Sequence, residues 1–288
     1  MEMDNVKVYS HTDPDVKPIL EKILRYAQQA KAMNLPYWVF VQDSNPIGIL
    51  AVGREPVQLL ASPGTPMALI NLIDAKQPKE IIETFAYEAQ KLAIQKKSEY
   101  ALATFPFNED VAINQFKKLN FMEFDDCYQM VCQLDKSFES SEELQFIQVK
   151  KEEMREFIKL AEKFLQGSPD ITLTEALKHM PELPDEFLNF YHSLEKIYFA
   201  NKNQQTIGVL NFNSSSGLIS SIGVDSQQRG KGYGRQIMLF GLEQLKKSGC
   251  KKAYLRVHIE NKPAVSLYES LGFVKAERYK RLIWRKLV

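Results

Sequence analysis

A glycine-rich stretch four-fifths of the way along the chain, GVDSQQRGKGYGRQIM at residues 223–238, could bind phosphate. Glycines at alternating positions let a backbone turn sharply and approach a ligand closely. The amides that begin the following helix have no intrahelical acceptor, and with the helix dipole they attract an anion, each favourable charge contributing about 0.3–1 kcal/mol. An exposed flexible turn is the alternative interpretation. The residues that would contact the anion are Arg229, Gly230, Lys231, Gly232, Tyr233, Gly234 and Arg235.

Two common phosphate-binding motifs do not fit this loop. A Walker A loop ends in Gly-Lys followed by Ser or Thr, whereas Lys231 is followed by Gly232. A Rossmann fingerprint has the spacing GxGxxG and an acidic residue about 20 positions further on. These glycines have the spacing GxGxG instead, and the nearest such residue, Glu260, lies further away. A nucleoside triphosphate or a dinucleotide is therefore a weak candidate for the ligand.

The elements around the loop should position it between a strand and a helix. The segment GLISSIGVD before it is β-rich, and the apolar pattern after it predicts a helix over residues 234–247. A second strand-like segment, AYLRVHI at 253–259, then leads to NKPAVSLYESLGF at 261–273. There Asn261 is a suitable helix N-cap, and Gly272 suits the position just after the helix end.

These motifs resemble those of the GNAT superfamily of N-acetyltransferases. The pattern Arg/Gln-x-x-Gly-x-Gly/Ala, between a strand and an amphipathic helix, is met by Arg229, Gly232 and Gly234. The resemblance is specific over residues 219–273, and the order of elements extends it to about 144–288. It implies that the anion on the loop is the pyrophosphate of acetyl-CoA, and that the three cations of the loop add charge there.

The same resemblance implies contacts with acetyl-CoA from the neighbouring elements. The strand before the loop would pair with the pantetheine arm and diverge from the next strand. A backbone amide near Val224 would donate to the oxyanion of the transition state. Asn261 would contact the arm as well as cap its helix, although capping alone would also explain it. The residues implied in these contacts are Ile222, Gly223, Val224, Asn261, Ala264 and Tyr268.

Tyr268 admits two interpretations. It shares a helix face with Ala264 and Leu271, and this spacing alone favours packing in the core. The resemblance implies instead that Tyr268 is the catalytic residue that gives a proton to the departing CoA thiolate. The matching position in the first half of the chain is Phe116, which has no proton to give. That half is therefore expected not to catalyse.

No general base carries over from the family. Some relatives have a glutamate on the strand before this helix, where this chain has Arg256. His258 and Glu260 alternate at the end of that strand, and Ser220 or Ser221 could order a water molecule. These four residues are the candidates for the base or for contacts with the acceptor. A base acting through water, or an amine that arrives neutral, remains open.

The two halves of the chain share an order of elements. Each begins with a short strand, continues with a helical pattern and a strand–turn–strand segment, and ends in a related unit, at residues 100–121 and 253–273. A repeat of this length is typical of domain duplication. We therefore predict a degenerate copy at 1–136, a charged, serine-rich linker at 137–143 and an acetyl-CoA-binding domain at 144–288.

Antiparallel hairpins combined with strand–helix units predict an α/β fold of the mixed α+β type. Two tandem GNAT-like domains are expected, each with a mixed, mostly antiparallel sheet flanked by helices. The first lacks the phosphate loop, because the matching segment 71–85 contains no glycine. The segment 172–196 is placed where a substrate lid could form.

Bulk composition indicates a globular protein with a core, since 44% of the residues are hydrophobic and 25% are charged. The net charge of +1 gives no overall field that would gather nucleic acid. From Ser226 onward Lys and Arg outnumber Asp and Glu fifteen to four, which is typical of a solvated basic face or of a local anion site.

The sequence also argues against a membrane or secreted protein. No segment approaches the roughly 18 apolar residues that a membrane span needs, and the acidic first ten residues predict no secretory signal. The 3 cysteines form no CxxC pair and the 4 histidines are scattered, so neither a disulfide framework nor a metal site is expected. A reducing cytoplasm is the predicted location.

The sequence thus predicts an N-acetyltransferase that uses acetyl-CoA as co-substrate and transfers its acetyl group directly to an amine. The acceptor is expected to be a small molecule or a peptide, and no motif identifies it. Neither nucleic acid nor a membrane is an expected partner. The alternative is a non-catalytic module that binds acyl-CoA or a protein partner.

Overall fold

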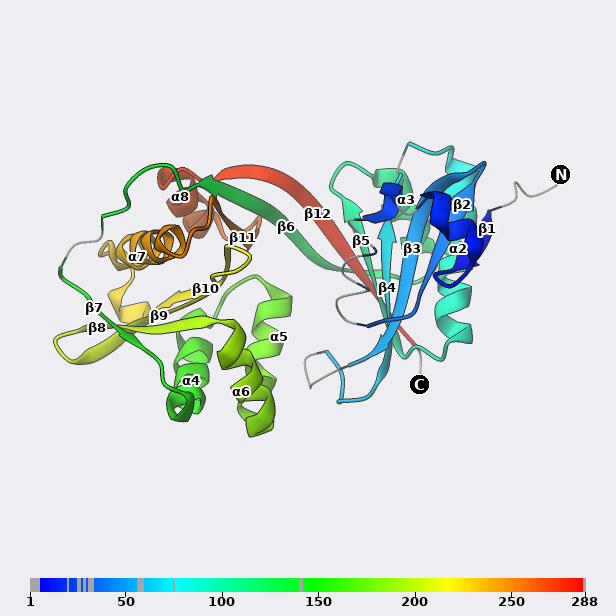
Figure 1. The fold of residues 1–288 in the computed structure, drawn as a ribbon. Helices are drawn as coiled ribbons and strands as arrows, with labels where there is room; N and C mark the ends of the chain where they lie inside the picture. The colour runs from blue at the N-terminus through cyan, green and yellow to red at the C-terminus, as the bar shows by residue number, and fades with distance from the viewer. Residues whose placement is uncertain are drawn as a thin grey trace. The chain divides into compact units, whose positions relative to one another are not determined.

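The computed structural model of this chain describes residues 6–19, 21–24, 27, 30, 34–55, 60–74, 76–139 and 142–286 (Figure 1). The chain divides into two compact units. Unit 1 comprises residues 1–57, 61–126 and 279–288, and unit 2 comprises residues 58–60 and 127–278. The predicted linker at 137–143 includes Ser140 and Ser141, which lie outside the described residues.

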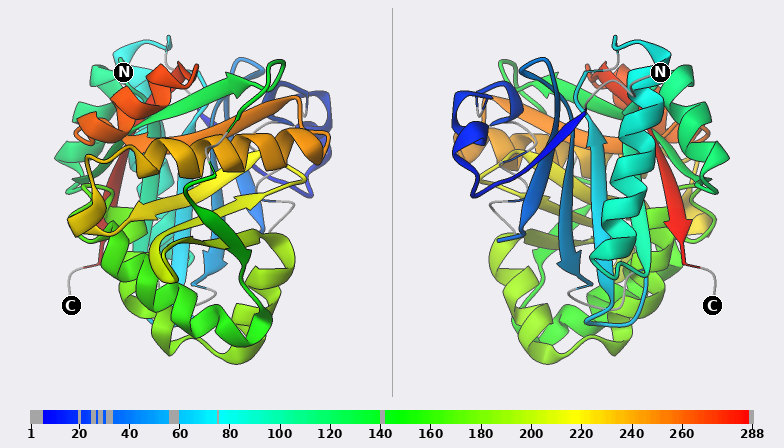
Figure 2. Two further views of the ribbon diagram at one scale, coloured as in Figure 1. Left: turned by 90° about the vertical axis from the view of Figure 1, so that its left-hand side faces the viewer. Right: turned by 90° about the vertical axis from the view of Figure 1, so that its right-hand side faces the viewer.

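Unit 1 is a sheet in the order β1-β2-β3-β4-β5-β12, in which β4 and β5 are parallel and the other pairs are antiparallel. Helix α2 packs on β3 and β4 and also contacts α3 (Figure 2, right). The elements are β1 (Lys7–Ser10), η1 (Pro14–Ile19), β2 (Tyr37–Gln42), β3 (Asn45–Arg54), β4 (Pro66–Leu72), α2 (Lys79–Gln95), β5 (Tyr100–Pro106), α3 (Asp110–Lys118) and the end of β12 (Val274–Arg285).

Unit 2 is a sheet in the order β6-β11-β10-β9-β8-β7, with β10 and β11 parallel and the other pairs antiparallel. Helices α7 and α8 lie on one face and α4, α5 and α6 on the other (Figure 1; Figure 2, left). The elements are β6 (Met122–Gln133), β7 (Gln145–Gln148), η2 (Lys151–Glu153), α4 (Met154–Leu165), α5 (Ile171–His179), η3 (Met180–Glu182), α6 (Asp185–Leu194), β8 (Lys196–Lys202), β9 (Gln205–Asn213), β10 (Leu218–Val224), η4 (Ser226–Gln228), α7 (Tyr233–Lys247), β11 (Lys252–His258) and α8 (Lys262–Ser270).

The predicted fold class, a mixed and mostly antiparallel sheet flanked by helices, is confirmed in both units. Local patterns account for much of it. Ala253, Leu255 and Val257 are buried on β11 while the residues between them are not, as the period of a strand requires. Helix α5 begins at Ile171. Asp170 is its N-cap, because its Oδ1 accepts from the Leu173 amide at 2.9 Å.

The end of each half preserves the internal duplication. Helices α3 and α8 both have 9 residues, and Phe116 and Tyr268 are the seventh residue of each. Two residues beyond the end of each helix lies a left-handed residue, Asn120 with φ +64° and Gly272 with φ +97°. Glycine and asparagine are the residue types that most often take the left-handed position just after a helix. The sequence alignment of the two halves therefore matches equivalent positions here.

Two strands pass from one unit to the other. Residues 127–133 of β6 pair with β11 in unit 2, and residues 279–285 of β12 pair with β5 in unit 1. The compact units are therefore not the two halves of the sequence. The boundaries 1–136 and 144–288 stay a prediction of where the duplicated copies begin and end.

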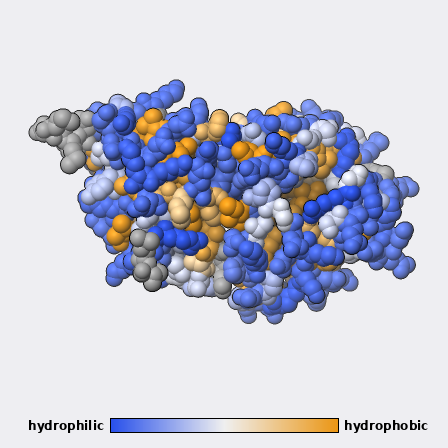
Figure 3. Space-filling view, turned by 180° about the vertical axis from the view of Figure 1, so that it is seen from behind, coloured by the Kyte–Doolittle hydropathy of each residue, from blue (hydrophilic) through white to orange (hydrophobic). Residues whose placement is uncertain are grey.

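Hydrophilic residues cover most of the face of the molecule shown in Figure 3. Among the described residues, no helix combines the length and the apolar character that crossing a bilayer demands.

Gly217, just before β10, should tolerate no side chain. Its φ is +76°, and a Cβ there would lie 2.3 Å from the Lys252 carbonyl oxygen. We expect Gly217→Ala to lower the free energy of unfolding by about 2–5 kcal/mol, combining left-handed backbone strain with the displacement of β11. Gly249→Ala is the control, because Gly249 has φ +89° with no atom within 4 Å of a Cβ. It should cost only about 1–2 kcal/mol, and urea unfolding measures both. Equal losses would contradict the predicted clash.

Candidate functional site

Strands β10 and β11 separate soon after they meet. Although they run parallel, their described lengths are paired at one position, Leu218 with Tyr254, and the Tyr254 amide donates to the Gly217 carbonyl at 2.9 Å. In unit 1 the corresponding strands β4 and β5 stay paired over 5 positions, beginning with Met67 and Tyr100. A gap between the two strands is therefore present in unit 2 and closed in unit 1.

The backbone of β10 turns two amides toward this gap. On its other side β10 pairs with β9, and Asp225 donates to the Ile207 carbonyl at 2.9 Å. Hydrogen-bonded and non-hydrogen-bonded pairs alternate in an antiparallel ladder, so Gly223 belongs to a bonded pair, whereas Ile222 and Val224 do not. The amides of Ile222 and Val224 therefore point away from β9, toward the side of β11.

The glycine loop leads from β10 into α7. Gly230 and Gly232 have φ +78° and +84°, and a Cβ at either would find no atom within 4 Å, so both border open space. Gly232 is the N-cap of α7 and supplies no side-chain cap. A Cβ at Gly234 would lie 3.4 Å from Leu267, an ordinary van der Waals distance, so Gly234 lies beside α8. The start of α7 thus has the open space and the absence of a side-chain cap that the predicted anion site requires.

Arg229 shapes the loop with its side chain. Its Nε donates to the Val224 carbonyl at 3.1 Å and its Nη2 to the Phe164 carbonyl at 2.7 Å. These bonds join the loop to the end of β10 and to α4. Gly223 allows α4 to lie close to β10, because a Cβ at this position would lie 3.0 Å from Phe164 Cβ.

The other two cations of the loop are exposed. Lys231 Nζ donates to Gln228 Oε1 at 2.9 Å, and Arg235 Nη1 donates to Ser270 Oγ at 2.9 Å. Neither contact includes a carboxylate. Both side chains lie at the surface beside the start of α7, where a charged ligand could meet them.

Tyr233 points into the core rather than toward the loop. It is 5% exposed, and its hydroxyl contacts Lys202 and lies 3.1 Å from Glu143 Oε1. Hydrogen bonds from Lys202, Gln236 and Tyr233 lower the pKa of Glu143 to about 2. This cluster fastens the segment before β7 to the first turn of α7.

Helix α8 carries Tyr268 to the wall of the gap. Asn261 caps the helix, its Oδ1 accepting from the Ala264 amide at 3.4 Å, so the predicted N-cap is confirmed. Tyr268 is 8% exposed, and burial raises the pKa of its hydroxyl to about 12. Within the described part of the chain that hydroxyl has no hydrogen-bond partner. A protonated phenol without a partner can give its proton to a bound group.

A small pocket opens between the separated strands. It brings together predicted residues from both strands and from α8, together with residues of the α4–α5 region. Its lining comprises Leu165, Ser168, Asp170, Leu173, Ile219, Ser220, Ser221, Ile222, Leu255, Arg256, Val257, His258, Asn261 and Tyr268. The loop residues, Ala264 and Glu260 lie outside this lining.

The predicted base candidates differ in their surroundings. His258 is half-buried at the pocket, and its Nδ1 accepts from the Glu260 amide at 3.3 Å. Glu260 is exposed. Ser220 Oγ donates to Glu195 Oε2 at 3.0 Å, and Ser221 contacts the Asn211 side chain. The two serines are thus linked to polar groups behind the pocket.

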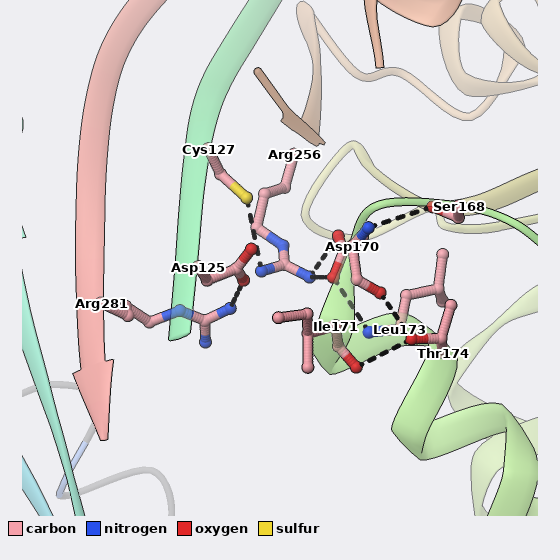
Figure 4. Close-up of polar contacts among 9 residues, drawn as sticks. All are labelled: Asp125, Cys127, Ser168, Asp170, Ile171, Leu173, Thr174, Arg256 and Arg281. Atoms are coloured by element: carbon pink, nitrogen blue, oxygen red, sulfur yellow. Dashed lines mark hydrogen bonds and ion pairs between the residues drawn. The ribbon is translucent and has the colours of Figure 1, made fainter. Parts of the chain in front are cut away.

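Arg256 closes one side of the pocket with an ion pair. Its Nη2 contacts both carboxylate oxygens of Asp170 at 2.6 Å, and its Nη1 lies 3.8 Å from Cys127 Sγ (Figure 4). Asp170 also caps α5, so one carboxylate holds both the helix start and β11. Sequence reasoning noted Arg256 only as a departure from the family and missed Asp170, Glu195 and Asn211. An Asp one residue before an apolar helical pattern was the available signal for Asp170.

Among the described residues of unit 1, aromatic side chains surround the position that corresponds to Tyr268. Phe116, in the place of Tyr268, packs against Phe85, Phe105 and Phe121 with ring centroids 4.9–5.9 Å apart. A Cβ at Gly48 would lie 2.3 Å from Phe85. Unit 1 therefore has a phenylalanine within an aromatic core at the position where unit 2 has Tyr268.

The fold and the site define a class of protein. Residues 158–273 match the family model described as the acetyltransferase (GNAT) family. We therefore assign this segment to the GNAT acetyltransferases, and the resemblance drawn from its motifs is confirmed.

Particular relatives and structures are similar to the chain. A mycothiol acetyltransferase of Thermobispora bispora is 44% identical over 59 residues, 20% of this chain and 20% of that protein. One of Renibacterium salmoninarum is 33% identical over 91 residues, 32% of this chain and 24% of that protein. The matches thus span about a quarter or less of these relatives.

Solved structures resemble nearly the whole chain in fold. A GCN5-related N-acetyltransferase from Sphaerobacter thermophilus has a TM-score of 0.66 at 12% identity, covering 98% of this chain and 97% of that one. A tandem GNAT protein from the clavulanic acid biosynthesis pathway has a TM-score of 0.59 at 13% identity, covering 97% and 98%. The tandem GNAT-like architecture is therefore confirmed at the level of fold.

Proposed function

We propose that this protein is an N-acetyltransferase that moves the acetyl group of acetyl-CoA to an amine. The observation that carries the proposal is the gap between β10 and β11, with the Tyr268 hydroxyl at its wall and the uncapped start of α7 beyond it. Unit 1 has Phe116 instead and keeps its strands paired. Unit 2 is therefore proposed to bind and transfer, and unit 1 to support the architecture.

The residues present fit acetyl-CoA. Gly230 and Gly232 leave open space at the start of α7, whose first amides would hold the pyrophosphate. Lys231 and Arg235 are the cations that would add charge, while Arg229 would keep the loop in shape through its bonds to the Val224 and Phe164 carbonyls. The arm would extend along β10, pairing with the outward-facing backbone, and acetyl-CoA would supply the thioester carbonyl for the amine to attack.

The protein groups at the gap would orient and stabilise the reaction. The Val224 amide is the proposed donor to the oxyanion that develops on the attacked carbonyl, and one such donor is typically worth about 3–4 kcal/mol. Holding the amine and the thioester in register can contribute about 7–11 kcal/mol more. Tyr268 would protonate the leaving sulfur.

The acceptor is proposed to be a small-molecule or peptide amine that enters from the face covered by α4, α5 and α6. That side of the pocket carries the polar residues Ser220, Ser221, Arg256 and His258. The curated relatives are named for mycothiol, but their short alignments do not extend that acceptor to this chain.

Acetyl-CoA should stabilise the native protein through the glycine loop. A ligand at about 100 times its Kd raises the free energy of unfolding by roughly 2.7 kcal/mol. We expect this shift for the wild type and its loss in Gly232→Glu, which puts a carboxylate where the pyrophosphate would lie. Thermal melting with and without acetyl-CoA measures the shift, and release of CoA thiol across a panel of amines measures turnover.

Gly249→Glu is the matched control for this experiment. Gly249 follows α7 as Gly232 precedes it, also with a positive φ and no atom within 4 Å of a Cβ. It should keep the acetyl-CoA shift. No shift in the wild type would overturn the proposed function. A shift without thiol release from any amine would make the protein a non-catalytic acyl-CoA-binding module.

A further inference from the structure

Glu195, one residue after the end of α6, is a half-buried carboxylate with neutral partners. Its Oε2 accepts from Ser220 Oγ at 3.0 Å and from Asn211 Nδ2 at 3.2 Å. Within the described chain these contacts include no cation, and Tyr191 is the titratable group that faces Glu195. A carboxylate removed from water without a cation costs free energy. Such groups gather at functional sites.

Burial has a definite effect on this carboxylate. It raises the pKa of Glu195 above the ordinary value for a glutamate, although the hydrogen bonds from Ser220 and Asn211 lower it in part. The ionised form is therefore a stronger base than a glutamate in water. The Ser220 hydroxyl, which contacts Glu195, belongs to a residue that lines the pocket.

An irregularity in β10 makes that hydroxyl available. The pairing of β10 with β9 shifts between Ile219 and Ser221, so Ser220 is an extra residue in the strand. Ile219 is buried in the core cluster on the α7 face, whereas Ser220 and Ser221 both reach polar groups behind the pocket. β-bulges of this kind re-aim side chains beside active sites. Ser220 consequently lines the pocket and contacts Glu195 at once.

We propose that Glu195 is the proton acceptor of acetyl transfer and that Ser220 is the relay connecting it to the amine. This inference rests on the proposed function. Because the Ser220 hydroxyl donates to Glu195, its oxygen can accept a proton from the pocket side. An ammonium group in the pocket gives a proton to the Ser220 oxygen as the original Ser220 proton passes to Glu195.

The remaining steps balance around Tyr268. The neutral amine forms a C–N bond at the thioester carbonyl, and the C–S bond breaks. The departing thiolate takes the Tyr268 proton, and the resulting phenolate recovers one from the new amide nitrogen. One ammonium and one thioester thus give one amide, one thiol and one proton, which leaves Glu195 for water.

The pH profile of Glu195→Gln tests the relay. The wild type, with ionised Glu195, should accept protons from ammonium, so kcat/KM should stay level from the raised Glu195 pKa up to the pKa of the amine. The variant can use only amine that is already neutral. Its kcat/KM should fall about 10²-fold or more at pH 7 and recover tenfold per pH unit until the amine pKa. The probe is whichever primary amine the wild type turns over fastest among an amino sugar, an alkyl diamine and an amino acid amide.

Two further variants separate the outcomes. Ser220→Ala should show the same recovery with pH, and Glu186→Gln, an exposed carboxylate in the first turn of α6, should keep the wild-type profile. Parallel profiles for the wild type and Glu195→Gln, including a loss that is constant with pH, would overturn the relay and leave the proposed function standing. A wild type that transfers acetyl to no amine would overturn the proposed function, and the relay with it.

Discussion

Tyr268→Phe is expected to lower kcat by about 10²–10⁴-fold, the usual contribution of a general acid, with little change in acetyl-CoA affinity. The hydroxyl that is lost has no hydrogen-bond partner among the described residues, so the free energy of unfolding should stay near that of the wild type. Phe116 shows that a phenylalanine fits the seventh position of this helix type. Because the pKa of Tyr268 is about 12, the phenol stays protonated through the neutral range and should add no titration step there.

The measurement is kcat and KM by thiol release, with thermal melting for each variant. Tyr198→Phe is the control, because Tyr198 is a partly buried tyrosine that packs against the same core cluster and lies outside the pocket lining. It should keep wild-type kcat. An undiminished kcat in Tyr268→Phe would mean that another group protonates the thiolate or that product release limits the rate. A large loss of stability would instead support the core-packing interpretation.

Elements with a strong local signal could be predicted from the sequence. The apolar stripe of α4 and the alternation of buried and less buried residues along β11 both follow from which side chains are hydrophobic. Likewise, Asn261 and Gly272 mark the ends of α8 by their own hydrogen-bonding and backbone preferences. The glycine loop was predictable for the same reason, since its conformation depends on residues that lie within it.

The parts of the site that were missed depend on distant contacts. Nothing local indicates that Arg256 pairs with Asp170, 86 residues away, or that Ser220 meets Glu195. The shift in β10 that exposes Ser220 arises from its register against β9, which a single strand sequence does not contain. In the same way, the motif indicates that Arg229 contacts phosphate, yet its guanidinium donates a hydrogen bond to the Phe164 carbonyl on α4.

The passage of β6 and β12 from one unit to the other could not be predicted from the sequence either, and we expect it to affect stability. Residues 127–133 complete the sheet of unit 2 beside β11, although the sequence halves place them in the first copy. Met130, Cys132 and Leu134 belong to the core cluster of unit 2. A fragment of residues 144–288, the domain drawn from the sequence, would lack all three side chains and leave β11 as an exposed edge.

We therefore expect the fragment 144–288 not to fold as a stable monomer. Each buried Met or Leu side chain contributes about 1.5–3 kcal/mol and the smaller Cys132 contributes less, so losing these three side chains removes a large part of the roughly 5–15 kcal/mol that stabilises a domain. An unpaired β11 would also invite association with other chains. The fragment 122–278 restores β6 and omits the end of β12 that pairs in unit 1, so it should melt cooperatively and keep the acetyl-CoA shift.

Circular dichroism melts and size-exclusion chromatography distinguish the two fragments. Cooperative melting of 144–288 as a monomer, near the temperature of 122–278, would show that the sequence boundary is the physical one and that β6 adds little. An unfolded 122–278 would show that unit 2 depends on unit 1 for more than this strand. Folding of 122–278 but not of 144–288 would mean that seven residues from the first half of the chain, 127–133, belong to the domain proposed to transfer acetyl groups.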